Sequence, residues 1–280
     1  MRAVAAATGY GTSAVSAQLA ALERDLGVEL IEQVGRNVRL TAAGRQLVGY
    51  AEQVLALVEA ARTALHGTES TGLLRVGAFA SVLSADIVPV VQQLAVSLPG
   101  LRLELQEREP TEVMQLLADD RIDLGFVDDY SLVPRFRDDG ALRFIFAAPL
   151  VLAVPTSRTA PEIIDSPQGL ASVADLPWVV NSRGDDDGEL VDRVCAASGI
   201  RPDIVHKVDS LELILEFVAA DLGIALVPAS VPAREGVNLV PMSADGPLRR
   251  TYAATRPGRQ DWPASALVTQ RVTAHAHGIT

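Results

Sequence analysis

The side chains that most often carry catalysis or bind metals are few and scattered in this 280-residue chain. The four histidines are His66, His206, His275 and His277, and the single cysteine is Cys195. One cysteine excludes an intrachain disulfide and a multi-cysteine metal site, and the two C-terminal histidines are more typical of a loose tail than of a metal site. The sequence has no Gly-rich phosphate loop, and no Ser/His/Asp order with supporting turn chemistry. We therefore expect no enzyme, no metal and no cofactor.

Hydroxyl and amide side chains recur where a short apolar run gives way to a helix. These residues are Ser81, Thr111, Asn181, Ser182 and Ser210. Helix N-termini present unpaired N–H groups and partial positive charge, so such junctions can bind a carboxylate or another anion. Each hydroxyl is equally suited to capping its own helix, so their convergence is the stronger sign of a ligand site. Arg183 is the candidate partner for a carboxylate.

Acidic side chains surround the same junctions. They are Glu107, Glu109, Asp128, Asp129, Asp185, Asp186, Asp187 and Asp209. The run from Asp185 to Asp187 is most simply a solvated helix start that the helix dipole favours. With this many carboxylates, a zwitterionic or cationic ligand stays open beside an anionic one.

The elements that position these residues follow from the pattern after residue 73. The predicted strands span 73–76, 101–106, 124–127, 150–154, 178–180 and 224–227, and the predicted helices span 84–97, 111–119, 190–198 and 211–220. Such alternation indicates parallel sheets of α/β type. In these sheets ligands bind beyond the carboxyl ends of the strands, near helix N-termini.

The N-terminal part follows a different pattern. It predicts an alanine-rich helix at 3–7, a turn, a second helix from about residue 14 to Gly27, and a small hairpin of runs 30–34 and 37–40. Thr12 or Ser13 is the predicted cap of the second helix. Its apolar residues recur at helical spacing and predict one buried stripe of Val15, Leu19, Leu22 and Leu26.

A long helix is predicted over residues 41–66, with Thr41 as its cap. Its apolar positions form a heptad seam of Leu47, Ala51, Val54, Val58, Ala61 and Leu65. A helix of this length, about 39 Å, more often pairs with a copy of itself than packs on its own domain. Residues 67–72 are polar and bounded by glycines, which indicates a hinge.

The charge is divided unevenly along the chain. The formal net charge is −11, yet residues 1–66 hold six arginines and six acidic residues, so the whole excess lies in residues 67–280. A neutral N-terminal segment does not exclude a nucleic-acid partner, although an evenly acidic surface would argue against one. The lone cysteine, the interrupted apolar runs and an alanine run too short for a signal peptide favour a cytoplasmic protein with no membrane contact.

Two groups of motifs, in order through essentially the whole chain, resemble the LysR-type transcriptional regulators. Residues similar to the DNA-binding domain of that family are Ala14-Val15-Ser16-x-Gln18-Leu19, Leu22-Glu23, Leu26-Gly27-Val28-x-Leu30 and Arg36-x-Val38-x-Leu40-Thr41-x-Ala43-Gly44. Residues similar to its effector-binding domain are Leu73-Leu74-Arg75-Val76-Gly77, Arg121-Ile122-Asp123-Leu124-Gly125 and Asp221-Leu222-Gly223-Ile224-Ala225-Leu226-Val227-Pro228. Periplasmic binding proteins share the fold of the second domain.

The resemblance implies a mainly α winged helix-turn-helix with a dimerising linker helix, followed by a two-lobed α/β periplasmic-binding-protein-like effector domain. The DNA-binding domain with its linker would span 1–66 and the effector domain 73–280. Lobe I would comprise 73–148 and 236–280, and lobe II 149–235. The implied function is an effector-responsive DNA-binding transcriptional regulator, and the alternative is a solute-binding or sensor protein of the same α/β fold that has lost DNA binding. The implied partners are double-stranded promoter DNA, a small-molecule effector in the cleft between the lobes, and further copies of the chain in a homodimer or homotetramer.

The resemblance places DNA contacts on the second helix and on the hairpin. The candidates are Thr12, Ser13, Ser16, Gln18, Arg36, Asn37 and Arg39. Gln18 has the side chain for a bidentate bond with adenine, and a solvated helix face is its alternative. Ser13 and Ala17 stand where the family usually has proline and arginine, which weakens the expected base reading. The family pattern also begins one helix earlier, so we expect either a start codon assigned too late, which we favour, or a domain that lacks part of its core.

Overall fold

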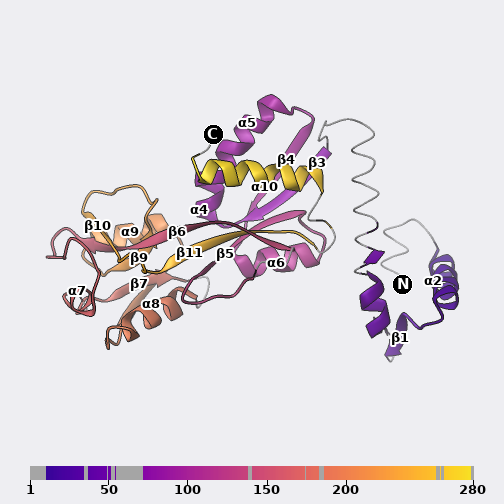
Figure 1. The fold of residues 1–280 in the computed structure, drawn as a ribbon, viewed down its shortest axis with the longest axis horizontal. Helices are drawn as coiled ribbons and strands as arrows, with labels where there is room; N and C mark the ends of the chain where they lie inside the picture. Colours follow the sequence, from indigo (N-terminus) through magenta and orange to yellow (C-terminus); the bar gives the residue numbers. More distant parts are fainter. Residues whose placement is uncertain are drawn as a thin grey trace.

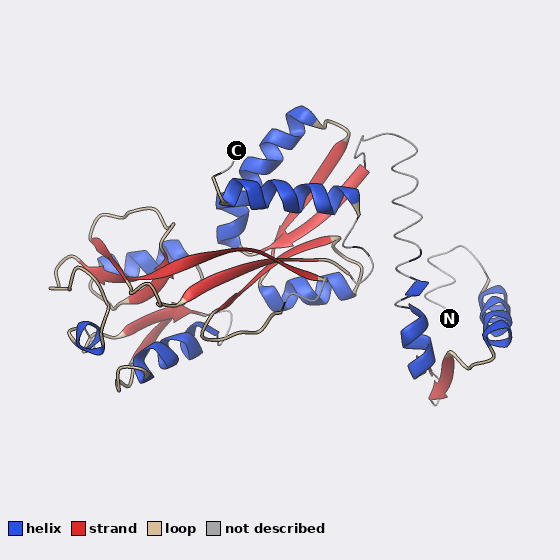
Figure 2. Ribbon diagram, in the orientation of Figure 1, coloured by secondary structure: helices blue, strands red, loops and turns tan. Residues whose placement is uncertain are grey.

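The computed structural model describes residues 11–34, 37–48, 50–51, 54, 72–137, 141–173, 175–182, 186–256, 259 and 262–278. Figure 1 follows the chain from the N-terminal helices to the α/β part, and Figure 2 shows the strands of the α/β part flanked by helices.

The N-terminal part contains a helix, a hairpin and the start of a further helix. Helix α2 (Thr12–Leu26) precedes the antiparallel strands β1 (Ile31–Val34) and β2 (Asn37–Leu40), and residues 42–48, 50–51 and 54 are helical. The predicted end of α2 is confirmed, because Gly27 has the left-handed φ of 67° that suits a helix C-terminus. The expected Thr12 or Ser13 cap is wrong: the N-cap is Gly11, and both residues already lie inside the helix.

Close contacts cap and join these N-terminal elements. The Glu23 carboxylate accepts hydrogen bonds from the backbone N–H groups of Leu30 and Ile31 at 2.7 and 3.1 Å. Thr41 Oγ1 accepts from the N–H of Gly44 at 3.0 Å, which confirms Thr41 as the cap of the next helix. A Cβ atom on Gly44 would collide with the carbonyl oxygen of Leu30, so this close approach requires glycine.

The predicted stripe of α2 is only partly covered. Val15 and Leu19 are half-buried, whereas Leu22 is 41% exposed and Leu26 is 47% exposed. The expectation of one buried stripe is therefore wrong for its C-terminal half among the residues described.

The first lobe of the α/β part contains a mixed sheet covered by helices. Its elements in chain order are β3 (Gly72–Ala78), α4 (Ala80–Val82), the π-helical turn η1 (Leu83–Ile87), α5 (Val88–Ser97), β4 (Leu101–Glu107), α6 (Pro110–Ala118) and β5 (Leu124–Tyr130), completed by β11 (Leu248–Ala254) and α10 (Pro263–Ala276). β3 pairs parallel with β4 and β5, and β11 pairs antiparallel with β5. Helix α10 packs against α5, as Figure 1 shows.

The second lobe has a core of its own. Its elements are α7 (Pro167–Ala171), β7 (Trp178–Asn181), α8 (Asp186–Ala196), β8 (Ile204–Val208), α9 (Leu211–Ala219), β9 (Ala225–Pro228) and β10 (Val237–Pro241). β7 and β8 pair parallel, and β9 and β10 flank the end of β6. Trp178, which is 1% exposed, and Cys195 lie in this core.

One long strand belongs to both lobes. β6 (Leu142–Pro155) pairs with β11 over residues 142–149 and with β9 and β10 over 150–155. It therefore runs from one lobe into the other, as Figure 1 shows. The α/β class and the two lobes are confirmed, but parallel pairing holds only for part of the sheet, because β6, β9, β10 and β11 pair antiparallel.

The strand β10 corrects the expected division of the chain. Residues 236–280 were expected in lobe I, yet β10 pairs with residues 151–155 of β6, on the edge opposite β9. The chain therefore returns to the first lobe after β10, with β11.

The helix over residues 80–97 is long and apolar enough, by length and composition alone, to cross a membrane. Core helices of soluble proteins pass the same test. Here Val82, Ile87, Val90 and Leu94 are buried in the core of the first lobe. We therefore describe it as a core helix.

Candidate functional site

A hydrogen bond connects the two lobes at the end of β5. Tyr130, the last residue of β5, donates its hydroxyl to Asp187 Oδ1 at 2.5 Å, and Asp187 lies in the first turn of α8. The other oxygen of Asp187 accepts from the backbone N–H of Asn181 at 3.1 Å. Asp187 therefore fixes the start of α8 both to its own lobe and to the first lobe.

The register between β5 and β11 explains which side chains meet here. Arg249 lies opposite Tyr130, and Arg250 lies opposite Asp129. Residues directly opposite share one face of a sheet, and neighbours along a strand alternate. Asp128, Tyr130 and Arg249 therefore project from one face, while Asp129 and Arg250 project from the other.

Arg249 is the buried cation of this face. It is 8% exposed, its Nη1 donates to Ser81 Oγ at 2.8 Å, and its guanidinium lies over the Phe79 ring at 5.3 Å. Its Nε lies 3.9 Å from Asp128 Oδ2 and has no hydrogen-bond partner among the described residues. The guanidinium thus has unused donor capacity.

The carboxyl groups of this face are held away from their ordinary titration range. Burial raises the pKa of Asp128 to about 7; the charge of Arg249 opposes this shift, and those of Asp187, Glu109 and Asp129 add to it. Burial likewise raises the pKa of Asp187, against the hydrogen bonds from Tyr130 and Asn181. The pKa of Tyr130 is raised by burial and by the neighbouring carboxylates.

On the opposite face, Asp129 and Arg250 are paired with each other. Arg250 donates to both oxygens of Asp129 at 2.8 and 2.9 Å, and Asp129 also accepts from the backbone N–H groups of Arg135 and Phe136. Arg135 forms an ion pair with Asp186 at the start of α8. These contacts hold the segment that follows β5 in place, so we assign them a structural role.

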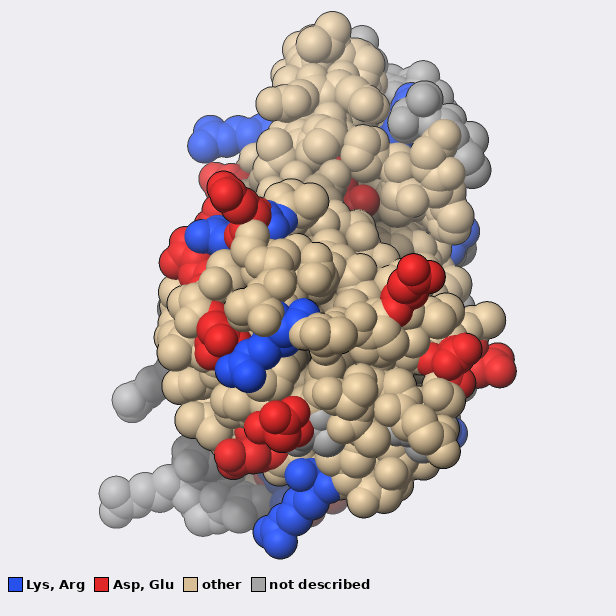
Figure 3. All heavy atoms as spheres, turned by 90° about the vertical axis from the view of Figure 1, so that its left-hand side faces the viewer, with Lys and Arg blue, Asp and Glu red and all other residues tan. Residues whose placement is uncertain are grey.

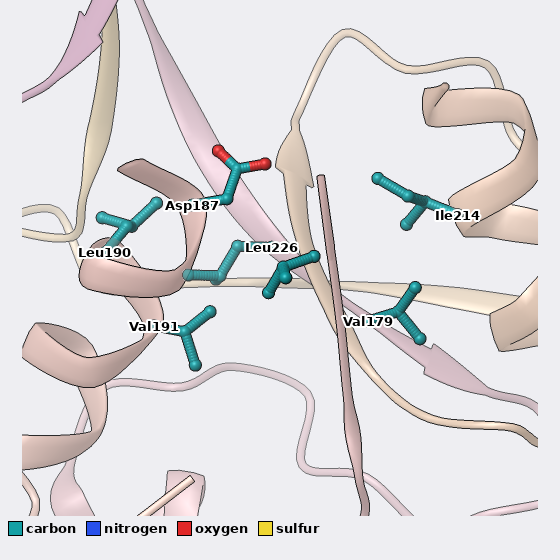
Figure 4. A pocket seen from close by; sticks show the side chains of 7 residues that line it. Val179, Asp187, Leu190, Val191, Ile214 and Leu226 are labelled. Atoms are coloured by element: carbon teal, nitrogen blue, oxygen red, sulfur yellow. The ribbon is translucent and has the colours of Figure 1, made fainter. Parts of the chain in front are cut away.

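Below the start of α8 lies a small apolar cavity of the second lobe, shown in Figure 4. Its lining comes from β7, α8, α9 and β9 and consists of Val179, Val180, Asp187, Leu190, Val191, Ile214 and Leu226. The Asp187 carboxylate is the only charged group among these side chains. Within the described residues no group of three His, Cys, Asp or Glu side chains is arranged to hold a metal ion.

Comparison with known families covers almost the whole chain. The profile of the LysR substrate binding domain matches residues 67–276, and that of bacterial regulatory helix-turn-helix proteins of the lysR family matches residues 1–45. The HTH-type transcriptional regulator IlvR of Caulobacter vibrioides is 32% identical over 250 residues, which cover 85% of this chain and 80% of IlvR. The chain belongs to the LysR family of transcriptional regulators. Regulators of this family bind DNA and small-molecule effectors.

Other similar proteins agree with this assignment. The probable hydrogen peroxide-inducible genes activator of Mycobacterium avium is 26% identical over 266 residues, covering 91% of this chain and 79% of that protein. A full-length OxyR variant of Pseudomonas aeruginosa has a TM-score of 0.62 at 22% identity and covers 97% of this chain and 90% of its own. Full-length CbnR in complex with its target DNA has a TM-score of 0.56 at 22% identity, covering 97% and 93%. These two structures show a shared fold.

The structure brings only some of the predicted effector residues of this LysR-family chain to the interlobe face. Ser81 lies at this face because its hydroxyl accepts a hydrogen bond from Arg249. Asn181 takes part through its backbone N–H, which donates to Asp187. Thr111, Ser182 and Ser210 are exposed, and Ser210 caps α9 by accepting from the N–H of Leu213. Thr111 does not cap α6, because Glu109 and Glu112 form a capping box there. Arg183 lies outside the described residues.

Two acidic residues take roles that differ from the sequence expectation. Asp187 was expected at a solvated helix start, yet it is bound by Tyr130 and Asn181. Asp129 was expected at the cleft rim, yet it is 2% exposed and paired with Arg250. Sequence reasoning did not identify Arg249 or Tyr130 as site residues. The missing signal is long-range: only the pairing of β11 with β5 brings Arg249 to this face.

The structure describes the side chains of only some of the predicted DNA-contacting residues. Ser13, Ser16 and Gln18 are exposed on α2, and Arg39 is exposed but pairs with Glu32 at 2.7 Å. Arg36 and the side chains of Thr12 and Asn37 lie outside the description. Of the predicted seam, Leu47 is half-buried, and Ala51 and Val54 are exposed. Val58, Ala61 and Leu65 lie outside the described residues.

Proposed function

We propose that this LysR-family regulator controls transcription in the cytoplasm by coupling a small molecule bound between its lobes to promoter binding. The observation that carries the proposal is the interlobe hydrogen bond from Tyr130 to Asp187, beside the half-buried Asp128 and the buried Arg249. A ligand held by these groups contacts both lobes and so favours one lobe arrangement over another. We infer no catalytic activity.

The DNA contacts are proposed on α2. Ser13, Ser16 and Gln18 are exposed along this helix, and a glutamine amide can bond adenine in the major groove through two hydrogen bonds. Arg36, Asn37 and Arg39 of the hairpin would contact phosphate or the minor groove. The Glu32 pair of Arg39 is a surface ion pair, which phosphate can displace at little energetic expense.

Association through residues 41–66 completes the proposal. Val54 is 60% exposed, and Ala51 beside it on the seam is also exposed, as expected of a surface that a second copy covers. A homodimer would present two copies of α2 to two half-sites. A tetramer would need further contacts between effector domains.

The test is a gel shift with the DNA upstream of the protein's own gene, before and after adding a protein-free small-molecule extract of the producing cells. We expect the extract to change the apparent affinity of the full-length chain. Tyr130→Phe, which lacks the interlobe hydrogen bond, should respond differently, whereas Tyr50→Phe, at an exposed position on the linker helix, should respond as the wild type. An extract that leaves wild-type binding unchanged would contradict effector control.

The exposed Leu22 and Leu26 favour a second candidate, a ligand sensor that does not bind DNA. A large apolar side chain left wholly uncovered forgoes about 1.5–3 kcal/mol of stabilisation, and Leu22 and Leu26 are each covered only in part. This candidate predicts that limited proteolysis removes residues 1–40 and leaves the effector domain intact. In the gel shift it predicts no shifted band.

A further inference from the structure

The interlobe face holds two opposite charges with unfilled hydrogen-bonding capacity. Arg249 is 8% exposed, and its Nε has no hydrogen-bond partner among the described residues. The Asp128 side chain is 16% exposed, and none of the described residues donates a hydrogen bond to its carboxylate. Asp128 Oδ2 and Arg249 Nε lie 3.9 Å apart, beyond hydrogen-bond distance. Buried polar groups normally find partners, so this pair points to a ligand that supplies them.

One half of this face suits a carboxylate. The helix over residues 80–97 begins beside it, and its N-cap Phe79 offers no side-chain acceptor to the first N–H groups. Ser81 lies in the first turn of that helix and accepts from Arg249. A helix N-terminus, a hydroxyl and a guanidinium together form an anion-binding arrangement.

The other half is too acidic for a simple anion. Asp128 faces Asp187 from α8 and Glu109 from the start of α6, and both negative charges act on it. The positive charge that acts on Asp128 is that of Arg249. The neighbouring Arg250 is bound to Asp129 on the opposite face of the sheet. A ligand with only a negative charge would be repelled by the carboxylates, and a ligand with only a positive charge would be repelled by the guanidinium. A ligand that carries both charges pairs with both halves.

We propose that the effector is a small zwitterion of the α-amino-acid type, with its protonated amine on Asp128 and its carboxylate on Arg249 and Ser81. The assignment rests on the proposed function of the interlobe site. The short separation of Asp128 and Arg249 matches such a molecule, because its amine and its carboxylate are attached to the same carbon. The side chain of the zwitterion would then distinguish one amino acid from another.

The proposal predicts a direction of pH dependence. The amine binds the ionised form of Asp128, whose pKa is raised to about 7 in the free protein. Affinity should therefore increase from pH 6 to pH 8, while the amine is still protonated. The charged groups that act on Asp128 are Arg249, Asp187, Glu109 and Asp129.

The test is isothermal titration of the full-length chain with each of the twenty standard L-amino acids, followed by the des-amino and decarboxy analogues of any that bind. We expect at least one amino acid to bind, and each analogue to bind about 10- to 100-fold more weakly, because each loses one charged hydrogen-bonding group. Asp128→Asn should weaken binding of the amino acid but not of its des-amino analogue. Ser81→Ala should weaken binding of both. Asp192→Asn, which makes the same charge change at an exposed position of α8, should change neither.

Three results separate this inference from the proposed function. Analogues that bind as tightly as the amino acid overturn the zwitterion assignment. Absence of binding by all twenty amino acids at millimolar concentration also overturns it, even where promoter binding still responds to the cell extract. An amino acid that binds with the expected analogue pattern but leaves promoter binding unchanged supports the zwitterion site and contradicts the proposed coupling to DNA.

Discussion

At the residue scale, the interlobe face depends on charges that are buried without complete pairing. Asp128 and Arg249 face each other at 3.9 Å, whereas Asp129 and Arg250, one residue along on each strand, are joined by two hydrogen bonds. The contrast separates the incompletely paired Asp128 on the interlobe face from the fully bonded Asp129 on the other face. Sequence analysis could identify Ser81 and the surrounding acids, since they follow predicted strands. It could not identify Arg249, because the contacts that place Arg249 come from residues more than one hundred positions away.

The titration of Asp128 gives a stability prediction. An ordinary aspartate titrates near 3.8, whereas the pKa of Asp128 is raised to about 7, so between these values the folded chain binds a proton that the unfolded chain has released. Stability should therefore fall as pH rises through this window. Asp128→Asn should make the fall shallower in ligand-free protein, measured by urea unfolding at pH 5, 6 and 7.5. An unchanged slope, matching Asp192→Asn, would show that Asp128 ionises normally.

The single cysteine argues against control by thiol oxidation, although one similar protein is named a peroxide-inducible activator. Cys195 is fully buried, and burial followed by the charge of Asp192 raises the pKa of its thiol to about 11. Little reactive thiolate is therefore present at neutral pH. Cys195→Ser should retain promoter binding, and a thiol reagent at pH 8 should label the folded wild type far more slowly than the unfolded chain. Loss of wild-type promoter binding in hydrogen peroxide, with Cys195→Ser unaffected, would refute this.

At the element scale, strands with regular apolar patterns were predictable and charged or edge strands were not. β3, β4, β5, β7 and β9 and helices α6, α8 and α9 lie where apolar periodicity predicts them. β11 was missed because it contains the charged residues Arg249 and Arg250, whose partners Ser81 and Asp129 are brought to them only by the fold. β8 was missed because its residues alternate between half-buried and exposed. The first half of β6 was missed because it contains several partly exposed residues.

The N-terminal junction gives a test at this scale. Gly44→Ala places a Cβ against the Leu30 carbonyl oxygen, so backbone must shift and the free energy of unfolding should fall by about 1–3 kcal/mol. Gly11→Ala is the control, because its Cβ would meet only the Ser13 hydroxyl at 3.8 Å. Thermal unfolding and promoter binding would both report the effect. Equal stability of the two variants would show that the junction tolerates a side chain.

The linker helix gives a second test. Glutamate at Val54 and Val58 should weaken association, because like charges would face each other across the predicted seam. Gln46→Glu adds one negative charge, half of that in the double variant, to the same helix at an exposed position off the seam. Sedimentation velocity should show a smaller species for the double variant only. A sedimentation profile identical to the wild type would exclude this seam as the dimer interface.

At the scale of the whole molecule, the acidic charge belongs to the effector domain and the N-terminal segment is neutral. Acidic and basic side chains alternate over the end of the second lobe, as Figure 3 shows. Ion pairs such as Arg193–Glu189 and Arg234–Glu216 belong to this lobe. Such a body gives DNA little long-range attraction, so the contacts proposed for α2 would have to supply most of the discrimination. Two lobes were predicted correctly from the sequence. The position at which the chain returns to the first lobe was not, because it depends on the pairing of β10 with an edge of β6, which the sequence does not show.

The most direct test of the account is the affinity of the full-length chain for the DNA upstream of its own gene, compared with a scrambled fragment of equal length. Fluorescence anisotropy at increasing salt would measure both. We predict at least about 1,000-fold tighter binding to the upstream fragment near physiological salt, the lower end for specific regulators. Non-specific binding should be lost first as salt rises. Equal affinity for both fragments at every salt concentration would contradict the central claim that this protein is a sequence-specific regulator.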